Sequence, residues 1–423
     1  MTSLDFSLPR GIRDIEPEEY ELHSRIRVSF EEVARAYNFK LMEPASIEHI
    51  SILRAKSGED VDKEIYAFED KGGREIGLRF DLTVGMTRYV CSRRDLKLPV
   101  KLAAFGGMWR YDEPQYGRYR WAHQWDLEIF GPPSVDADAE VVDASAAILR
   151  RAGVGPAKVR IGDRRVVEEF VREGPGSSDA RAAELMRALD KTGKKTRAEL
   201  QKEYGAKGFS DAEFSRVMDF GEVKGPPDKV LQKLQELGLA STKDLAELRD
   251  SLRSRKVENF EFDLSIVRGI DYYTGIVFEA ADEKLPRLGS LFGGGRYDAL
   301  PKLFGRPELS ATGAAGGVER ESMSLGKSSA RAQLTAVIAT ASPEVYPQAV
   351  GVLSELRSAG ISSDLSGRGK SLAKQLEEAG ASNALWAVIV GRKEVEKGVV
   401  TLRNLKERAE EQVSLKEAVL RMA

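Results

Sequence analysis

The sequence has few of the side chains that build disulfide frameworks and metal centres. Cysteine occurs only at Cys91, and the histidines are His23, His49 and His123. A single thiol excludes an internal disulfide and a four-thiolate zinc site, and three histidines argue against a histidine-based metal site. We interpret Cys91 as a small buried side chain rather than a catalytic nucleophile, and we expect no structural metal.

The chain also lacks a net charge and a long apolar run. Its 65 basic and 67 acidic residues leave a formal charge of -2, which excludes a disordered polyelectrolyte and a global attraction to nucleic acid. The longest apolar run, residues 384–390, is far shorter than the roughly 20 residues that cross a bilayer. Residues 1–10 do not have the pattern of a signal peptide. These absences predict a soluble, cytoplasmic protein with no membrane or DNA partner.

The apolar material is sufficient for several cores. Of 423 residues, 42% are hydrophobic, and the length predicts two or three domains. Mixed helix and strand patterns occupy residues 1–163 and return in 257–327, whereas 164–256 is helical and highly charged. We predict one discontinuous domain, 1–163 with 257–327, interrupted by a helical insertion. The charges of the insertion fit a solvated surface better than a specific binding face.

Local periodicity predicts individual elements in the first 330 residues. Helical spacing of apolar residues indicates a helix over 16–37, and a glycine-containing turn indicates a hairpin over 65–80. Residues 100–130 have the pattern of two long strands around a polar loop. Strand alternation begins again at Phe260, and we expect it to continue to Phe278.

Residues 331–423 alternate strands and helices over short connections. This pattern indicates a separate, small α/β domain with a largely parallel sheet. Its second predicted helix, 371–379, is followed by Gly380, which we expect to end that helix.

The second long strand, residues 120–130, separates two kinds of side chain, because alternate residues of a strand share a face. One face is mostly apolar and carries Trp121, His123, Trp125, Leu127 and Ile129. The other face is mostly polar and carries Ala122, Gln124, Asp126 and Glu128. The polar face fits recognition of a small polar ligand, and it equally fits the wet face of an antiparallel sheet.

Arginines beside the same strands favour the ligand interpretation. Arg110, Arg118 and Arg120 flank a loop that contains proline and glycine. Planar, forked guanidinium groups at fixed positions suit bidentate binding of phosphate. The sequence has no Gly-x-x-x-x-Gly-Lys-Ser/Thr loop, so phosphates would be held by arginines rather than by a backbone cradle.

The stretch 105–131 resembles the second signature motif of class II aminoacyl-tRNA synthetases, and in its details it is similar to the histidyl-tRNA synthetase family. Other motifs along the chain agree with this resemblance. Residues 37–52 and 312–320 resemble the first and third class II motifs, and residues 78–83 resemble the amino-acid-binding segment. Residues 267–273 and 293–298 resemble two motifs peculiar to the histidine enzymes. The resemblance extends from about residue 6 to the C-terminus.

The resemblance implies a multidomain protein of mixed α+β and α/β class. Its catalytic domain would be a class II antiparallel β-sheet, formed by 1–163 and 257–327 with the helical insertion 164–256. A small α/β anticodon-binding domain, 331–423, would follow. The implied reaction activates histidine with ATP to give histidyl-adenylate, and then transfers the histidyl group to the 3′ end of tRNA(His). Mg²⁺ would accompany ATP, and the protein would be a homodimer.

The resemblance also assigns roles to individual residues. Catalysis falls to Arg110 and Arg268, and ATP binding to Arg110, Arg118 and Arg320. The histidine-binding residues are Asp81, Thr83, Gln124, Glu128, Arg268, Tyr272 and Tyr273. Glu128 and Tyr273 would contact the imidazole, whereas Asp81 and Thr83 would contact the ammonium group. Read without the resemblance, Tyr272 and Tyr273 could equally be core aromatics, and Asp126 receives no role.

This sequence departs from the family pattern at Ala122, where an aromatic ring usually stacks on adenine. Either Trp121 replaces that ring through a shift of register, or Arg320 holds the adenine from one side only. Strand alternation favours the second alternative. The residues after Arg320 begin with Glu321, which is less apolar than usual at a helix-packing position.

Two other functions are compatible with parts of the sequence. The first is a synthetase-like regulatory subunit of histidine biosynthesis, which would bind histidine without charging tRNA. Such paralogues typically lack the C-terminal domain and the arginines, whereas this chain keeps Arg110, Arg268 and Arg320. The second is a class II ligase for another amino acid, against which Glu128 and the motif 267–273 both argue.

Overall fold

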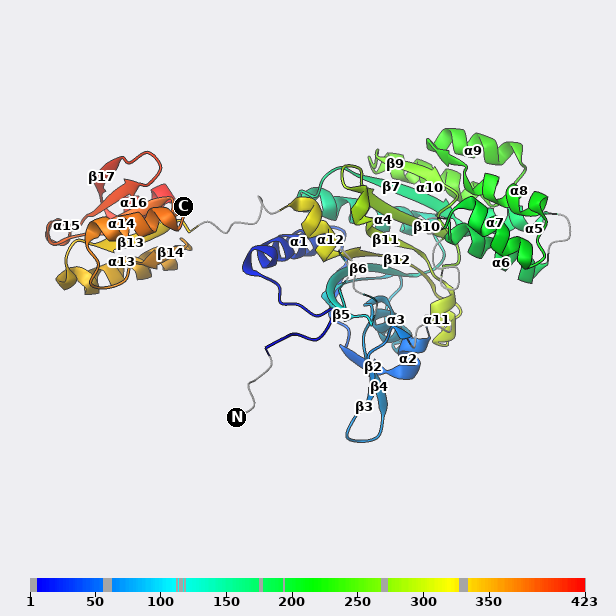
Figure 1. Ribbon diagram of the computed structural model, residues 1–423, viewed down its shortest axis with the longest axis horizontal. Coiled ribbons are helices and arrows are strands. Elements are labelled where there is room, and N and C mark those ends of the chain that lie inside the picture. Colours follow the sequence, from blue (N-terminus) through cyan, green and yellow to red (C-terminus); the bar gives the residue numbers. More distant parts are fainter. Residues whose placement is uncertain are drawn as a thin grey trace. The chain divides into compact units, whose positions relative to one another are not determined.

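The computed structural model divides the chain into two compact units, Met1–Ala330 and Arg331–Ala423 (Figure 1). It describes residues 6–55, 63–111, 113, 117, 119–174, 178–192, 195–267, 273–326 and 334–422. Among the helices in these ranges, none is long and apolar enough to cross a membrane.

A nine-stranded sheet forms the centre of the first unit. Its order is β1 (Lys40–Met42), β5 (Val100–Trp109), β6 (Trp121–Gly131), β12 (Ser310–Gly317), β11 (Ser290–Arg296), β10 (Ile276–Asp282), β7 (Ala157–Asp163), β9 (Phe260–Asp263) and β8 (Lys224–Gly225). The pairs β1–β5 and β7–β9 are parallel, and the others are antiparallel. The sheet is therefore mixed, with an antiparallel centre.

The strand alternation expected over 120–130 is confirmed in β6, whose two faces pack against different helices. Trp125, Leu127 and Ile129 are buried in a core shared with α1 (Pro17–Ala36) and α4 (Val135–Ala152). Phe130 projects to the other face, where it joins α3 (Thr83–Ser92) and α11 (Ala299–Leu303). Figure 1 shows these two pairs of helices on opposite sides of β6 and β12. The polar residues of β6 thus lie on the α3 side.

The predicted hairpin over 65–80 is confirmed as β3 (Ala67–Glu69) and β4 (Glu75–Leu78), with β2 (Ile47–His49) on the other side of β4. Asp70 organises its turn, because Oδ1 of this residue accepts hydrogen bonds from the backbone N–H groups of Gly72 and Arg74. The short helix α2 (Ile50–Arg54) follows β2 and buries Ile50 and Leu53 against this small sheet.

The charged segment after β7 is helical, as predicted. It contains α5 (Arg164–Arg172), α6 (Asp179–Asp190), α7 (Arg197–Ala206), α8 (Asp211–Gly221), α9 (Pro227–Glu236) and α10 (Thr242–Ser254). Phe170 and Phe220 stack with ring centroids 3.8 Å apart, and many of the charges pair with one another at the surface. The apolar faces of these helices join the same core as α1 and α4.

The strand expected to run from Phe260 to Phe278 is wrong as a continuous element. Strand β9 ends at Asp263, and β10 begins only at Ile276. Asp263 ends the first strand, because its Oδ1 accepts from the backbone N–H and the hydroxyl of Ser265 and its carbonyl accepts from the N–H of Ile266. Leu264 and Ile266 are buried and produce the apolar alternation, but they lie in a turn.

The second unit contains a five-stranded sheet and is an α/β layer, as expected. The strand order is β14 (Ser363–Leu365), β13 (Ala336–Thr340), β15 (Trp386–Val390), β16 (Val400–Asn404) and β17 (Glu410–Val413). The helices are α13 (Tyr346–Ser358), α14 (Leu372–Ala381), α15 (Arg392–Lys397) and α16 (Leu415–Met422), and the 3₁₀ helix η4 (Pro343–Val345) directly precedes α13. Another 3₁₀ helix, η2 (Pro286–Leu288), belongs to the first unit.

Two details of the second unit differ from the sequence-based expectation. The pairs β13–β14 and β13–β15 are parallel, but β15–β16 and β16–β17 are antiparallel, so the sheet is only half parallel. Helix α14 continues through Gly380 to Ala381. Asn383 takes the left-handed conformation after the helix, with φ of 57°. Asn383, and not Gly380, therefore has the helix-ending conformation that we expected of the glycine.

Candidate active site

Two adjoining cavities lie over the polar face of β6. The larger has a volume of about 280 Å³ and the smaller about 170 Å³. Both are lined by Arg110, Gln124, Gly293 and Ala315, which therefore form the boundary between them. Two ligands bound in these cavities would meet at Arg110 and Gln124.

The smaller cavity brings together most of the residues expected to bind histidine. Its lining includes Asp81, Thr83, Gln124, Glu128 and Tyr273, together with Tyr297, Gly313 and Ala314. These side chains come from α3, β6, the segment before β10, and β11 to β12, which are far apart in the sequence. Arg268 and Tyr272 lie outside the described residues.

A chain of hydrogen bonds fixes the polar side chains of the smaller cavity. Thr83 Oγ1 donates to Asp126 Oδ2 at 3.0 Å, and Gln124 Nε2 donates to Asp126 Oδ1 at 2.6 Å. Arg110 Nη2 in turn donates to Gln124 Oε1 at 3.3 Å, and its Nε donates to the carbonyl of Phe80 at 2.8 Å. Asp126, which received no role from the sequence, orients both Thr83 and Gln124.

Glu128 is held at the inner end of the smaller cavity. Its side chain is buried, and its Oε2 accepts a hydrogen bond from the hydroxyl of Tyr297. The pKa of the Tyr273 hydroxyl is raised above its ordinary value, first by burial and then by the negative charge of Glu128 and its acidic neighbours. Tyr273 is therefore a neutral hydroxyl at physiological pH and can donate or accept a hydrogen bond.

Sequence reasoning missed Tyr297. The motif 293–298 was recognised, but only as a family signature, and nothing local connects its tyrosine to Glu128. The contact depends on the pairing of β11 with β12 and of β12 with β6. A tyrosine directly after a glycine-rich strand is the signal that could have identified it.

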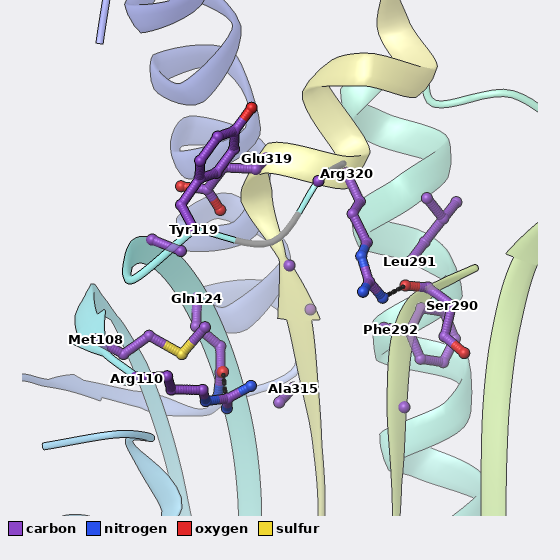
Figure 2. Close-up of a pocket in the computed structure, with 15 residues that line it drawn as sticks. Met108, Arg110, Tyr119, Gln124, Ser290, Leu291, Phe292, Ala315, Glu319 and Arg320 are labelled. Atoms are coloured by element: carbon purple, nitrogen blue, oxygen red, sulfur yellow. Dashed lines mark hydrogen bonds between the residues drawn. The ribbon is translucent and has the colours of Figure 1, made fainter. Parts of the chain in front are cut away.

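The larger cavity has guanidinium groups on two sides. Arg110 lies on the β5–β6 side, and Arg320, from α12 (Val318–Leu325), lies across the cavity, where its Nη1 donates to the carbonyl of Ser290 at 2.9 Å (Figure 2). Two such cations in one cavity suit an anionic ligand with several oxygens, such as a polyphosphate. Arg118 lies outside the described residues.

The structure shows whether Ala122 or Trp121 faces the larger cavity. Ala122 pairs with Met108 of β5, and both side chains line the larger cavity. Trp121 pairs with Trp109 and does not line the cavity; its ring instead makes an edge contact with that of His123 at 5.2 Å. No shift of register brings Trp121 to the cavity, so the alternation expected from the sequence is confirmed.

Helix α12 is attached to β6 through two glutamates. Glu319 Oε1 accepts from the backbone N–H of His123 at 2.8 Å, and Glu321 Oε1 accepts from the indole N–H of Trp125 at 2.8 Å. Burial raises the pKa of Glu321 well above its ordinary value. The reduced apolarity after Arg320 is thus explained by specific hydrogen bonds that position Arg320.

An antiparallel-centred sheet with arginines over an anion-binding cavity, beside a smaller cavity lined by polar side chains, is the arrangement of a class II aminoacyl-tRNA synthetase. The model of the family described as "Histidyl-tRNA synthetase" matches residues 11–320, and the model described as "Anticodon binding domain" matches residues 335–422. The chain belongs to the histidyl-tRNA synthetase family. The resemblance recognised in the sequence is therefore confirmed.

Individual relatives agree over nearly the whole chain. Histidine–tRNA ligase of Pyrobaculum islandicum is 38% identical over 406 residues, which are 95% of this chain and 94% of the relative. That of Thermococcus kodakarensis is 36% identical and covers 97% and 96%. The crystal structure of histidyl-tRNA synthetase from Nostoc sp. PCC 7120 superimposes with a TM-score of 0.87 at 25% identity, covering 100% of both chains.

A further solved structure bears on the regulatory alternative. A protein from Bacillus halodurans C, described as an ATP phosphoribosyltransferase regulatory subunit/histidyl-tRNA synthetase, superimposes with a TM-score of 0.76 at 25% identity. The match covers 92% of this chain and 99% of that one. The fold alone therefore does not separate a ligase from a regulatory subunit, and the residues of the two cavities must do so.

Proposed function

We propose that this protein is a histidine–tRNA ligase. It activates histidine with ATP, forming histidyl-adenylate and pyrophosphate, and transfers the histidyl group to the 3′ end of tRNA(His). The observation that carries the proposal is the junction of the two cavities at Arg110 and Gln124. An amino acid in the smaller cavity and ATP in the larger one place the amino acid carboxylate beside the α-phosphate at this junction.

The first step requires positioning rather than a general base. A carboxylate is already a nucleophile at neutral pH, and the barrier comes from bringing it to a phosphorus atom surrounded by negative oxygens. Arg110 neutralises charge at the α-phosphate, while Arg320 holds the distal part of the nucleotide. Arg268 is assigned to the same task by its motif, and Arg118 to the outer phosphates. The new bond joins a carboxylate oxygen to the α-phosphorus, and pyrophosphate leaves with the electron pair of the broken bond.

Specificity for histidine is assigned to Glu128 and the tyrosines around it. A neutral imidazole has one ring N–H donor and one ring nitrogen acceptor. Glu128 accepts from the donor, and Tyr273 contacts the other nitrogen. Asp81 and Thr83 take the ammonium group, and Gln124 lies near the carboxylate. An amino acid without an imidazole would not donate the ring N–H hydrogen bond to the buried carboxylate of Glu128, and the loss of that bond is how such a site rejects it.

Adenine recognition follows from the residues that flank Ala122. In place of an aromatic ring, the β5–β6 wall offers the thioether of Met108, and Arg320 lies on the facing wall. We assign the adenine to the space between them, because a polarisable sulfur and a planar guanidinium both pack well on an aromatic face.

Mg²⁺ is expected to enter with ATP. Among the described residues that line the larger cavity, Glu319 provides the one carboxylate. That donor set fits an ion held mainly by phosphate oxygens and water, which is how Mg²⁺ is commonly bound. The ion would neutralise charge on the outer phosphates.

The domain assignment and the assembly are part of the proposal. Residues 1–163 with 257–327 form the catalytic domain, 164–256 the helical insertion and 331–423 the anticodon-binding domain. The helices α5 to α10 support the insertion, and the match over residues 335–422 supports the separate C-terminal domain. The protein acts as a homodimer in the cytoplasm, as the first class II motif at 37–52 implies.

The decisive test is the exchange of labelled pyrophosphate into ATP with each of the twenty amino acids in turn. A histidine–tRNA ligase exchanges with histidine and not with the others. A regulatory subunit would bind histidine without any exchange, and a ligase of different specificity would exchange with another amino acid. Aminoacylation of total tRNA with labelled histidine then tests the second step.

A glycine on β12 provides a test of the place of Glu128. A Cβ atom at Gly313 would lie 1.6 Å from Glu128 Oε2, so we expect Gly313→Ala to displace this carboxylate and to raise the KM for histidine about 100-fold. At Gly317, on the same strand, a Cβ would meet only the Leu291 carbonyl at 4.0 Å. Gly317→Ala is therefore the matched control, and it should keep the KM for histidine. Equal effects of the two substitutions would contradict the assignment.

A further inference from the structure

Two of the three histidines lie close to a carboxylate beside β6. His23 comes from α1, His123 from β6 and Glu319 from α12, and Figure 1 shows α1 and α12 side by side over this strand. One ligand atom from each of the three residues lies within 4.8 Å of the others. His123 Nδ1 is 3.7 Å from Glu319 Oε1, and the two imidazole rings are 5.4 Å apart at their centroids, at 74° to each other.

Three of the four ring nitrogens of this cluster have no hydrogen-bond partner among the described residues. The side chain of His23 is only 6% exposed, yet neither Nδ1 nor Nε2 has a hydrogen-bond partner, and the same is true of Nδ1 of His123. Buried polar atoms without a partner are rare in native proteins, because desolvation is then uncompensated. A bound ion would satisfy one nitrogen of each ring, and Nε2 of His23 lies 3.5 Å from Glu19 Oε1.

Two charged side chains lie next to His23, one on α1 and one in the segment before it. The nearest other charges are Glu19, whose Oε1 is 3.5 Å from His23 Nε2, and Arg13, which forms a two-pronged ion pair with Glu19. The charge of Arg13 is thereby neutralised locally, and the cluster keeps the negative charge of Glu319.

We propose that His23, His123 and Glu319 bind one divalent transition-metal ion of the zinc type, with water as the fourth ligand. Two imidazoles and a carboxylate form a donor set that suits Zn²⁺, whereas Mg²⁺ prefers oxygen ligands throughout. Zinc bonds of about 2.0–2.2 Å place two tetrahedral ligands roughly 3.5 Å apart, so the observed side chains need to close only slightly.

Glu319 also lines the larger cavity, so the proposed site adjoins the region expected for the Mg²⁺ that accompanies ATP, but its two imidazole ligands lie outside that cavity's lining. Its three ligands connect α1 and β6 to α12, and α12 carries Arg320 to the larger cavity. A metal ion at this position fixes the helix on which the nucleotide-binding arginine is mounted. The inference does not depend on which amino acid the enzyme activates.

The test is a metal titration of the full-length protein after treatment with a chelator. Competition with a coloured chelator measures Zn²⁺ affinity, and Co²⁺ reports coordination geometry through its visible absorption. We expect one equivalent to bind, and His23→Asn and His123→Asn each to weaken binding by about 100-fold or more. His49→Asn is the matched control, because His49 is exposed and outside the cluster. Cys91 cannot compete as a thiolate, since burial raises the pKa of its thiol to about 11.

A third variant covers the case in which a histidine substitution prevents folding. Glu319→Gln keeps an oxygen that can accept from the N–H of His123 but removes the charged ligand. Zn²⁺ should raise the melting temperature of the wild type and of His49→Asn, and should leave that of Glu319→Gln unchanged. Equal Zn²⁺ binding by the wild type and by Glu319→Gln would overturn the proposal. The proposal would also be overturned if the wild type bound Zn²⁺ no more strongly than a variant that combines His23→Asn with His123→Asn.

Discussion

Arg110→Ala should reduce histidine-dependent exchange of pyrophosphate into ATP by about 1,000-fold or more, because it removes the guanidinium at the junction of the two cavities. Preorganised cations that stabilise charge developing at a phosphoryl group contribute several kcal/mol to the transition state. Arg110 is suited to this role, since it lines both cavities and is held by Gln124 and by the carbonyl of Phe80. The exchange rate at saturating histidine and ATP measures the effect.

Two further substitutions separate charge, geometry and folding in this experiment. Arg110→Lys keeps a positive charge but loses the planar fork, so its activity should lie between those of the wild type and Arg110→Ala. Arg35→Ala removes an exposed arginine that pairs with Glu31 on α1, and it should leave exchange unchanged. If Arg110→Ala keeps its melting temperature and exchanges within tenfold of the wild type, Arg110 does not act on the α-phosphate.

Glu128→Gln should raise the KM for histidine about 100-fold while changing the KM for ATP by less than about threefold. A hydrogen bond that the imidazole N–H donates to a buried carboxylate contributes about 1.5–3 kcal/mol. Gln has the same shape and can still accept from the hydroxyl of Tyr297, so the cavity should keep its form. Steady-state exchange kinetics with each substrate varied separately measure both constants.

Tyr297→Phe provides the partner variant. It removes the hydroxyl that orients Glu128 but leaves the carboxylate, so we expect a smaller rise in the KM for histidine in the same direction. The effects of the two substitutions should be less than additive when combined, because both act through one hydrogen-bonded pair. If Glu128→Gln raises the KM for histidine and the KM for ATP equally, the imidazole is recognised elsewhere.

The sequence alone determined the polar face of β6. Gln124 and Glu128 are four residues apart on one strand, and a period of two places them on the same side whatever surrounds the strand. The same rule separated Trp121 from Ala122. Motifs of known family identified the two arginines that the structure brings to one cavity, and they did so from residues more than two hundred positions apart. Local spacing and motif identity are both properties of short segments, so they can be recognised from the sequence without coordinates.

Local pattern failed where a hydrogen bond changed the course of the chain. The apolar alternation after Phe260 continued through Leu264 and Ile266, although Asp263 had already turned the backbone through its bonds to Ser265. Burial and strand geometry both produce alternation, so the sequence could not distinguish a buried turn from a strand. Gly380 likewise lies within a helix because Asn383, three residues later, takes the left-handed conformation.

Only the tertiary structure decided which distant side chains touch. The contact of Tyr297 with Glu128 needs the register of three strands, and the link of Asp126 to Thr83 needs α3 to pack over β6. The scarcity of histidine argued against a histidine-based metal site, yet packing of α1 and α12 on β6 brings His23 and His123 to one carboxylate. Composition counts residues, but coordination and catalysis depend on distances, and distances between segments are set by packing and strand register.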